Sequence, residues 1–186
     1  MAEGLDHLIV THCAPTLMGM KAGNMFSLKR CAFVDREEKL QAILNMLREN
    51  GLYARVFHTP WNASLIYLYR RNLLQENLSH PLSRSLLLSL HYRGRDTEEL
   101  VEQLGQRMEE NVSFPHEIGL FLGYPPEDVA GFVKHKGAGC KISGCWKVYG
   151  DVGKARMLFD LYSSCRHACL QCLKCGMTLI EVAKAV

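Results

Sequence analysis

The sequence lacks any apolar run long enough to cross a lipid bilayer. Its longest apolar segments, such as Leu65 to Tyr69, fall far short of the roughly 20 residues that a spanning helix needs. It also lacks the basic and then apolar leader of an exported protein, because it opens with Met-Ala-Glu-Gly-Leu-Asp-His. We therefore expect a cytoplasmic protein that is not exported and has no membrane association.

Net charge is also small. The 22 Lys and Arg against 19 Asp and Glu give +3, which provides no overall field to attract nucleic acid, so we do not expect a nucleic-acid partner on this ground. The remaining composition, 48% hydrophobic and 22% charged, is typical of a globular protein rather than a disordered one. The length of 186 residues suits one domain spanning 1–186.

Three well-known nucleotide and metal motifs are missing. There is no G-x-x-x-x-G-K-[ST] phosphate loop, no G-x-G-x-x-G after a strand and no H-E-x-x-H. Nucleotide hydrolysis, Rossmann-type dinucleotide binding and zincin chemistry therefore have no sequence support.

Hydrophobic periodicity predicts an α+β domain. Aromatic and β-branched residues at 52–58 and 63–70 predict a hairpin, and the second strand should lie inside the sheet because neither of its faces is polar. Alternation over 140–149 predicts a third strand. The expected core is a small, mainly antiparallel three-stranded sheet covered by several helices.

Helix signals flank these strands. Asp35 with Glu38, and Asp96 with Glu99, have the chemistry of capping boxes, and Asp151 begins a long C-terminal helix predicted to reach about Cys175. Shorter helices are predicted at 81–91, 118–122, 125–136 and 179–185. The first 30 residues contain Pro15, Gly19 and Gly23 among apolar residues, so we expect short, irregular structure there.

Three segments carry a resemblance to a known family. They read HCAPTL at 12–17, FPHEIGLFLGYPPEDV at 114–129 and WKVYGD at 146–151. Together they are similar to the hallmark stretches of the bacterial family called domain of unknown function 3793, and the resemblance covers nearly the whole chain. It implies a protein of anaerobic Gram-positive bacteria, often encoded near flavodoxins. The family commonly has an aromatic residue where this chain has Cys145.

The eight cysteines are expected to be reduced thiols rather than a disulfide framework. Cys165, Cys169, Cys172 and Cys175 resemble a cluster-binding run. On one helix the first and last stand roughly 15 Å apart, so one metal ion cannot bind all four. Cys165 and Cys169 are candidate metal ligands if Cys13 or Cys140 joins them. They are otherwise small apolar fillers of a helix face, or thiols that regulate by oxidation.

A second group of candidates combines a thiol, an imidazole and a carboxylate. Cys13 is a candidate nucleophile or redox thiol, His116 its base, and Glu117 or Asp128 an orienting acid. This requires the fold to bring Cys13 to His116, since adjacent side chains point apart. Alternatively, Cys13 packs the N-terminal segment and Glu117 begins a short helix.

Candidate cofactor contacts are basic and aromatic. Arg55 and Arg70 lie beside Tyr67 and Tyr69 in the hairpin, a combination that can hold a phosphate-bearing cofactor or stack on bases, although strand aromatics more often form core. Two further candidates come from the family segments, His12 and Trp146.

Three functional hypotheses remain open. The first is an accessory factor in anaerobic redox or metal physiology that binds a cofactor, a metal or a flavodoxin-like partner. The second is a thiol-dependent enzyme that uses Cys13. The third is a non-catalytic module for protein or nucleic-acid interaction.

Overall fold

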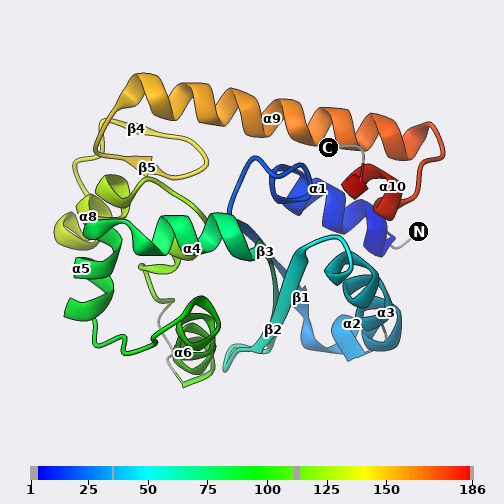
Figure 1. Ribbon diagram of the computed structural model, residues 1–186, viewed down its shortest axis with the longest axis horizontal. Helices are drawn as coiled ribbons and strands as arrows, with labels where there is room; N and C mark the ends of the chain where they lie inside the picture. Colours follow the sequence, from blue (N-terminus) through cyan, green and yellow to red (C-terminus); the bar gives the residue numbers. More distant parts are fainter. Residues whose placement is uncertain (1–3, 35, 111–113, 185–186) are drawn as a thin grey trace.

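A three-stranded antiparallel sheet forms the middle layer of the computed structural model, which describes residues 4–34, 36–110 and 114–184 (Figure 1). The strands are β1 (Gly23–Lys29), β2 (Leu52–His58) and β3 (Ala63–Arg70). Their order is β1-β3-β2, and Ile66 at the centre of β3 pairs with Phe26 on one side and Val56 on the other. The predicted antiparallel hairpin is therefore confirmed.

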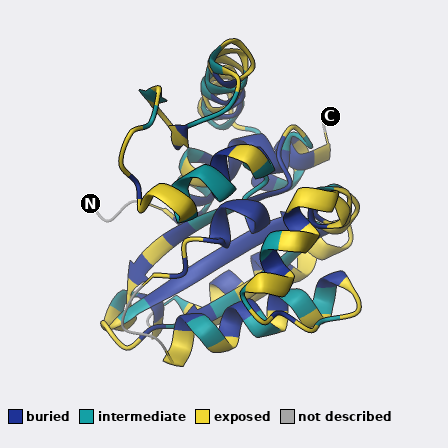
Figure 2. Ribbon diagram, turned by 90° about the vertical axis from the view of Figure 1, so that its left-hand side faces the viewer, coloured by how far each residue is buried: buried dark blue, intermediate teal, exposed yellow. Residues whose placement is uncertain are grey.

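The central strand has two apolar faces, as its sequence predicts. Ile66 and Leu68 enter one hydrophobic cluster, whereas Leu65, Tyr67 and Tyr69 enter another. Because side chains alternate along a strand, these two sets point to opposite faces of the sheet. Figure 2 shows β3 as a buried band between helices. Helices on both faces therefore make this strand the centre of the molecule.

The helices form two groups, one on each face (Figure 1). The first face is covered by α1 (Leu5–Leu17), α2 (Arg30–Val34), α3 (Glu37–Arg48) and α10 (Leu179–Lys184). The second face is covered by α4 (Arg71–Ser79), α5 (Pro81–Ser89), α6 (Thr97–Glu110), α7 (Ile118–Phe121) and α8 (Pro126–His135). The long helix α9 (Val152–Lys174) runs above both groups.

A small hairpin lies beneath the first turns of α9. It consists of β4 (Ile142–Ser143) and β5 (Lys147–Val148), which pair only with each other. Trp146 and Val148 of this hairpin pack against Ala155 and Tyr162 of α9 in a third hydrophobic cluster. The hairpin is thereby fixed between α8 and α9.

The third strand of the sheet is not the one that the sequence predicts. The segment 140–149 forms the separate β4–β5 hairpin, because Gly144 turns the chain and its N–H bonds to the carbonyl of Trp146. Its place in the sheet is taken by β1, within a region expected to be irregular. A 13-residue helix, α1, precedes β1, with Pro15 accommodated in its last turn. The buried residues of α1 include Leu5, Ile9, Cys13 and Leu17, a helical repeat that the interrupting residues obscure.

The predicted capping residues have mixed outcomes. Asp96 accepts the N–H of Glu99 at 2.9 Å, and Asp151 accepts that of Lys154 at 3.0 Å, so both helix starts are confirmed. Asp35 lies outside the described residues, and α3 begins after Arg36 without a side-chain cap.

Helix α4 was not predicted, because it follows β3 directly and has no capping residue at its start. In the described part of the chain, no helix has both the length and the apolar character of a membrane span.

Candidate functional site

An apolar cavity of about 330 Å³ opens between α7, α8 and the β4–β5 hairpin. We call it the aromatic pocket. Its wall includes four aromatic side chains and three polar ones, which are Phe114, Tyr124, Phe132, Trp146, His116, Cys145 and Lys147. The Lys147 ammonium donates one hydrogen bond to the carbonyl oxygen of Gly137 at 2.7 Å, which leaves its other two hydrogens for a ligand. The pocket thus joins two of the family segments, 114–129 and 146–151.

Asp128 holds the two sides of this pocket together. Asp128 is 2% exposed, and its carboxylate accepts three hydrogen bonds, each 2.7 Å long. One comes from the indole Nε1 of Trp146, and two come from the backbone N–H groups of Tyr149 and Gly150. Asp128 lies in the first turn of α8, where the helix dipole also favours a carboxylate. The carboxylate therefore positions Trp146 and is fully engaged in doing so.

Trp146 is a fixed wall of the pocket. Its ring stacks on Tyr124 at 4.8 Å between centroids and meets Phe159 of α9 edge-on at 4.5 Å. The preceding turn lies so close to α9 that a Cβ on Gly144 would stand 2.3 Å from a ring carbon of Phe159. Only glycine fits at that position without displacing the aromatic ring. The wall is therefore held before any ligand arrives.

His116 and Glu117 point to different parts of the molecule. The exposed His116 ring lines the aromatic pocket and meets Phe132 edge-on at 4.9 Å. Glu117 is buried, accepts a hydrogen bond from the Tyr92 hydroxyl at 3.1 Å and pairs with Arg107 at 3.3 Å. That carboxylate is one cause of the raised pKa of Tyr92, after burial. Glu117 is engaged with α6 and does not orient His116.

The comparisons with known proteins give one match. The family model described as "Protein of unknown function (DUF3793)" matches residues 9–183. The chain belongs to the DUF3793 family. Neither the curated proteins nor the solved structures gave a match. In this DUF3793 chain, the second and third family segments converge on the aromatic pocket, whereas Cys13, in the first segment, packs in the core.

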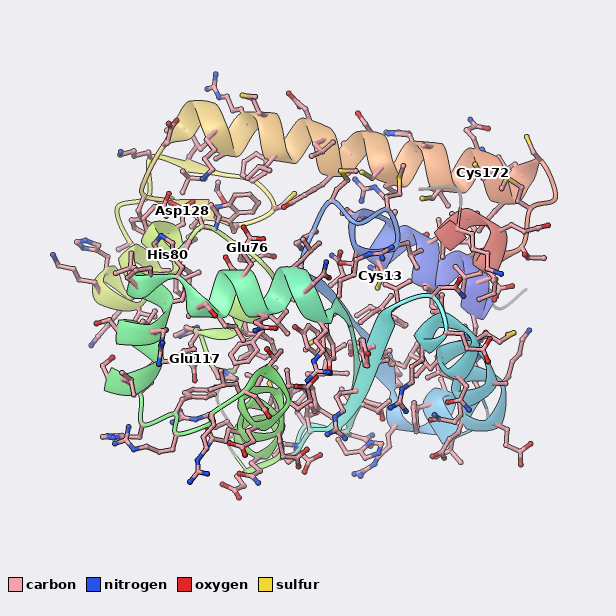
Figure 3. The ribbon with its side chains drawn as sticks, in the orientation of Figure 1. Cys13, Glu76, His80, Glu117, Asp128 and Cys172 are labelled. Atoms are coloured by element: carbon pink, nitrogen blue, oxygen red, sulfur yellow. The ribbon has the colours of Figure 1, made fainter. Side chains whose placement is uncertain are left out.

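Cys13 is not close to the His116 and Glu117 segment. It is fully buried in the hydrophobic cluster between α1, α9 and α10, and Figure 3 shows it well separated from Glu117. Burial raises the pKa of the Cys13 thiol to about 12, and the charge of Lys21 opposes this shift. The thiol is therefore protonated at neutral pH and has the surroundings of an inert core cysteine. The geometry gives no support to the hypothesis of a Cys13 nucleophile.

Thiol alkylation of the native protein measures this difference. We expect the exposed Cys31, Cys145 and Cys175 to react with iodoacetamide at the rate of an ordinary thiol, and Cys13 and Cys169 to react only after unfolding in urea. Peptide mass spectrometry at successive times distinguishes the sites. Alkylation of Cys13 as fast as Cys31 would reinstate it as a candidate nucleophile.

Cys165 and Cys169, the candidate metal ligands, also lie in the first hydrophobic cluster. Burial raises the pKa of both thiols, for Cys169 to about 11, which opposes the thiolate form that binds metals. Across the described ranges, no three His, Cys, Asp or Glu side chains are placed to share an ion. Their arrangement on α9 is that of apolar fillers beside Tyr162.

The candidate cofactor contacts of the hairpin are used within the fold. Arg70 donates to the carbonyl oxygens of Thr16 and Leu17, at 2.8 and 2.5 Å, and so closes the end of α1. Arg55 is exposed and pairs with Glu102 at 3.0 Å. Tyr67 and Tyr69 are buried and stack on each other, which removes them from any base or ring outside. His12 is exposed and stacks on Phe26 at the sheet edge.

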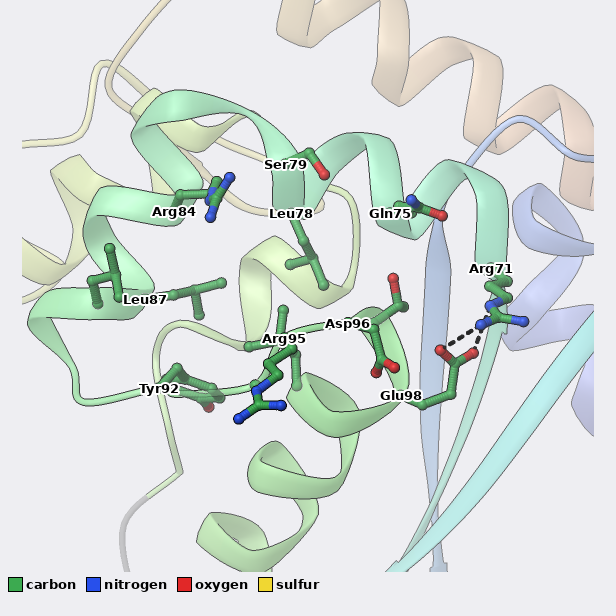
Figure 4. Close-up of a pocket in the computed structure, with 14 residues that line it drawn as sticks. Arg71, Gln75, Leu78, Ser79, Arg84, Leu87, Tyr92, Arg95, Asp96 and Glu98 are labelled. Carbon is green, nitrogen blue, oxygen red and sulfur yellow. Dashed lines mark hydrogen bonds and ion pairs between the residues drawn. The ribbon is translucent and has the colours of Figure 1, made fainter.

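A second cavity, of about 260 Å³, lies between α4, α5 and the start of α6 (Figure 4). Three arginines line it, but they do not form one anion site. Arg71 is paired with Glu98 at 2.7 Å, and the guanidinium groups of Arg84 and Arg95 do not converge in Figure 4. The aromatic pocket is therefore the stronger candidate for a ligand site.

His116 and Trp146 were predicted from the sequence as site residues, but most of the residues of this pocket were not. Phe132 follows Asp128 by four residues, so helical spacing places both on one face of α8 and provides a signal for it. No comparable signal marks Lys147 or Cys145 as pocket residues, because only the closure of the β4–β5 hairpin brings them to α8.

Proposed function

We propose that this DUF3793 protein binds a small planar ligand in the aromatic pocket. The observation that carries the proposal is a preformed cavity of about 330 Å³ whose wall includes Phe114, Tyr124, Phe132 and Trp146. Ligand sites are typically concave, mostly apolar and supplied with a few polar groups that fix orientation. Here those groups are the His116 imidazole, the Cys145 thiol and the Lys147 ammonium.

The chemistry of the lining defines the ligand class. Aromatic walls favour a flat, conjugated ring system, because stacked and edge-on ring pairs add stabilisation beyond the buried area. An ammonium and an imidazole favour a carbonyl or an anionic substituent at the ring edge. Phe114 is 42% exposed at this pocket, where a ligand would cover apolar surface that now faces water.

Of the three hypotheses, cofactor binding by an accessory protein is the one that the pocket supports. A redox role and a flavodoxin-like partner belong to this proposal only if the ligand is a redox-active ring such as a flavin. The panel of test ligands therefore includes both redox-active and redox-inactive rings.

Tryptophan fluorescence provides the test, because the chain has only two tryptophans. The Trp61→Phe variant, at an exposed position away from the pocket, leaves Trp146 as the single reporter. We expect saturable quenching by a planar compound of about 20 non-hydrogen atoms. At about −0.3 kcal/mol per atom, its Kd is on the order of tens of micromolar. Riboflavin, indole carboxylates and quinones form a suitable panel.

Two controls make the result specific. A cyclohexane carboxylate of similar size should not quench, and Trp146→Phe should weaken binding measured by calorimetry. Quenching that rises linearly with every compound, with no saturation, would contradict the proposal.

A further inference from the structure

Lys21 occupies an unusual position for a lysine. It follows α1 in the loop to β1 and is only 6% exposed. It lines a third cavity, of about 470 Å³, which lies between α4, the start of α8 and α9. We call this the lysine pocket. Glu76 of α4 and His80, which lies between α4 and α5, line it as well, and both are labelled in Figure 3.

The Lys21 ammonium has no acidic partner. Of the three buried charged residues in the described chain, Glu117 pairs with Arg107 and Asp128 accepts three hydrogen bonds. Lys21 instead lies over the faces of two tyrosine rings, 4.8 Å from the centroid of Tyr124 and 5.4 Å from that of Tyr162. No hydrogen bond or ion pair joins it to another described residue. Among the described residues, it is the one buried charge without an oppositely charged or hydrogen-bonded partner.

This environment favours the neutral amine. Burial lowers the pKa of Lys21 to about 8, against small opposing effects of the Cys13 and Cys145 thiols. At pH 7, about a tenth of the side chain is then the free amine, compared with less than about a thousandth of an ordinary lysine. A desolvated lysine of this kind is a typical nucleophile toward carbonyl carbon.

The charges of the lining indicate what kind of molecule fits. Two carboxylates, Glu76 and Glu127, line the pocket together with Lys154, so its charge does not favour an anion over a neutral molecule. The same carboxylates, with the His80 imidazole, are groups that can transfer protons near an amine. A neutral carbonyl compound can react with the amine and exchange protons with these groups, and the carboxylates do not repel it.

We propose that the lysine pocket binds a small neutral aldehyde or ketone and that Lys21 forms an imine with it. The nitrogen lone pair attacks the carbonyl carbon and gives a carbinolamine. Loss of the carbonyl oxygen with the two amine hydrogens, as water, then leaves the C=N bond. The step is a condensation that needs no oxidant or reductant, and water reverses it. This site and the aromatic pocket share no lining residue.

Reductive trapping tests the proposal on the unmodified protein. Propanal and cyanoborohydride convert each imine to a stable propyl amine, which peptide mass spectrometry assigns to individual lysines. At pH 7 we expect Lys21 to be labelled at least about tenfold faster than the exposed Lys154, since the excess of free amine outweighs the lower intrinsic nucleophilicity of a less basic nitrogen. The rate at Lys21 should saturate with propanal concentration, because binding precedes the condensation.

The pH profile and a competitor separate a binding site from a merely reactive amine. Labelling of Lys21 should level off above about pH 8, whereas that of a lysine in a short model peptide should keep rising. Acetone should compete at Lys21 but not at Lys154, and inorganic phosphate should not compete. Equal rates at the two lysines, a linear dependence on propanal at Lys21, or protection by phosphate would each overturn the proposal.

Discussion

Replacing Asp128 with alanine is expected to lower the free energy of unfolding by about 3–5 kcal/mol. The substitution leaves three donors without their acceptor, the Trp146 indole and the N–H groups of Tyr149 and Gly150. Each unpaired buried donor costs about 1–3 kcal/mol, reduced where water can enter. Because a domain of this kind has only about 5–15 kcal/mol in total, the loss is readily measured by urea denaturation.

The same variant should disturb the aromatic pocket more than the rest of the fold. Without the carboxylate, the indole loses its hydrogen bond to α8, so the fluorescence of Trp146 should shift toward that of an exposed tryptophan. Asp128→Asn is the finer test. Its amide oxygen can still accept two N–H groups, but its NH₂ group faces a third donor, and we expect a loss of about 2 kcal/mol.

Asp151→Ala is the matched control. This aspartate is exposed and accepts one hydrogen bond as the N-cap of α9, so its loss should cost about 1 kcal/mol without changing the Trp146 signal. If Asp128→Ala were no more destabilising than Asp151→Ala, Asp128 would not be the residue that joins α8 to the β4–β5 hairpin.

The features of this fold that depend on neighbouring residues in the sequence were predicted correctly. The interior position of β3 follows from a strand with no polar face, and the capped starts of α6 and α9 follow from Asp96 and Asp151. The partner of β3 on its other edge could not be read in this way. Both 23–29 and 140–149 carry strand-compatible residues, and the choice depends on Gly144 turning the second segment back on itself.

The candidate site was harder to predict, because it depends on contacts between distant segments. His116 and Trp146 were found through the family segments, and the structure places both at one pocket. Asp128 was considered, as an alternative to Glu117, for an acid that orients a histidine. Its bond to Trp146 could not be predicted, since no local pattern shows that a carboxylate on α8 accepts an indole N–H from 18 residues later. Cys13 was a candidate nucleophile because it is a thiol beside a histidine. Its environment is instead set by its position in the buried repeat of α1.

Lys21 had no signal in the sequence, and its burial leads to the second large expected effect. Replacing it with methionine should raise the free energy of unfolding at pH 7 by up to about 3 kcal/mol. The pKa is about 8 in the folded protein against a usual value of 10.5, and each unit of difference corresponds to about 1.4 kcal/mol. Methionine keeps the length and apolar character of the side chain and removes the charge. Loss of the interaction with the two tyrosine rings will offset part of the gain.

The dependence of this gain on pH has a definite sign. Below about pH 8 the lysine is protonated in both states, so the folded state carries the whole cost of the buried charge. Between about pH 8 and 10.5 the folded protein binds fewer protons than the unfolded chain, and stability relative to the methionine variant rises with pH. The advantage of Lys21→Met should therefore shrink over that range. Parallel urea denaturation series at pH 7, 8.5 and 10 measure it.

Lys154→Met provides the comparison at an exposed lysine of the same pocket, where we expect a change within about 0.5 kcal/mol at every pH. A destabilising effect of Lys21→Met at pH 7 would show that the charge stabilises the fold. Burial of Lys21 would then carry no net free-energy cost. Stability is commonly sacrificed at functional sites, so a stability cost at Lys21 agrees with the proposed reaction of its amine. The urea series thus measures what the burial of Lys21 costs in stability, and the aldehyde labelling independently measures the reactivity of its amine.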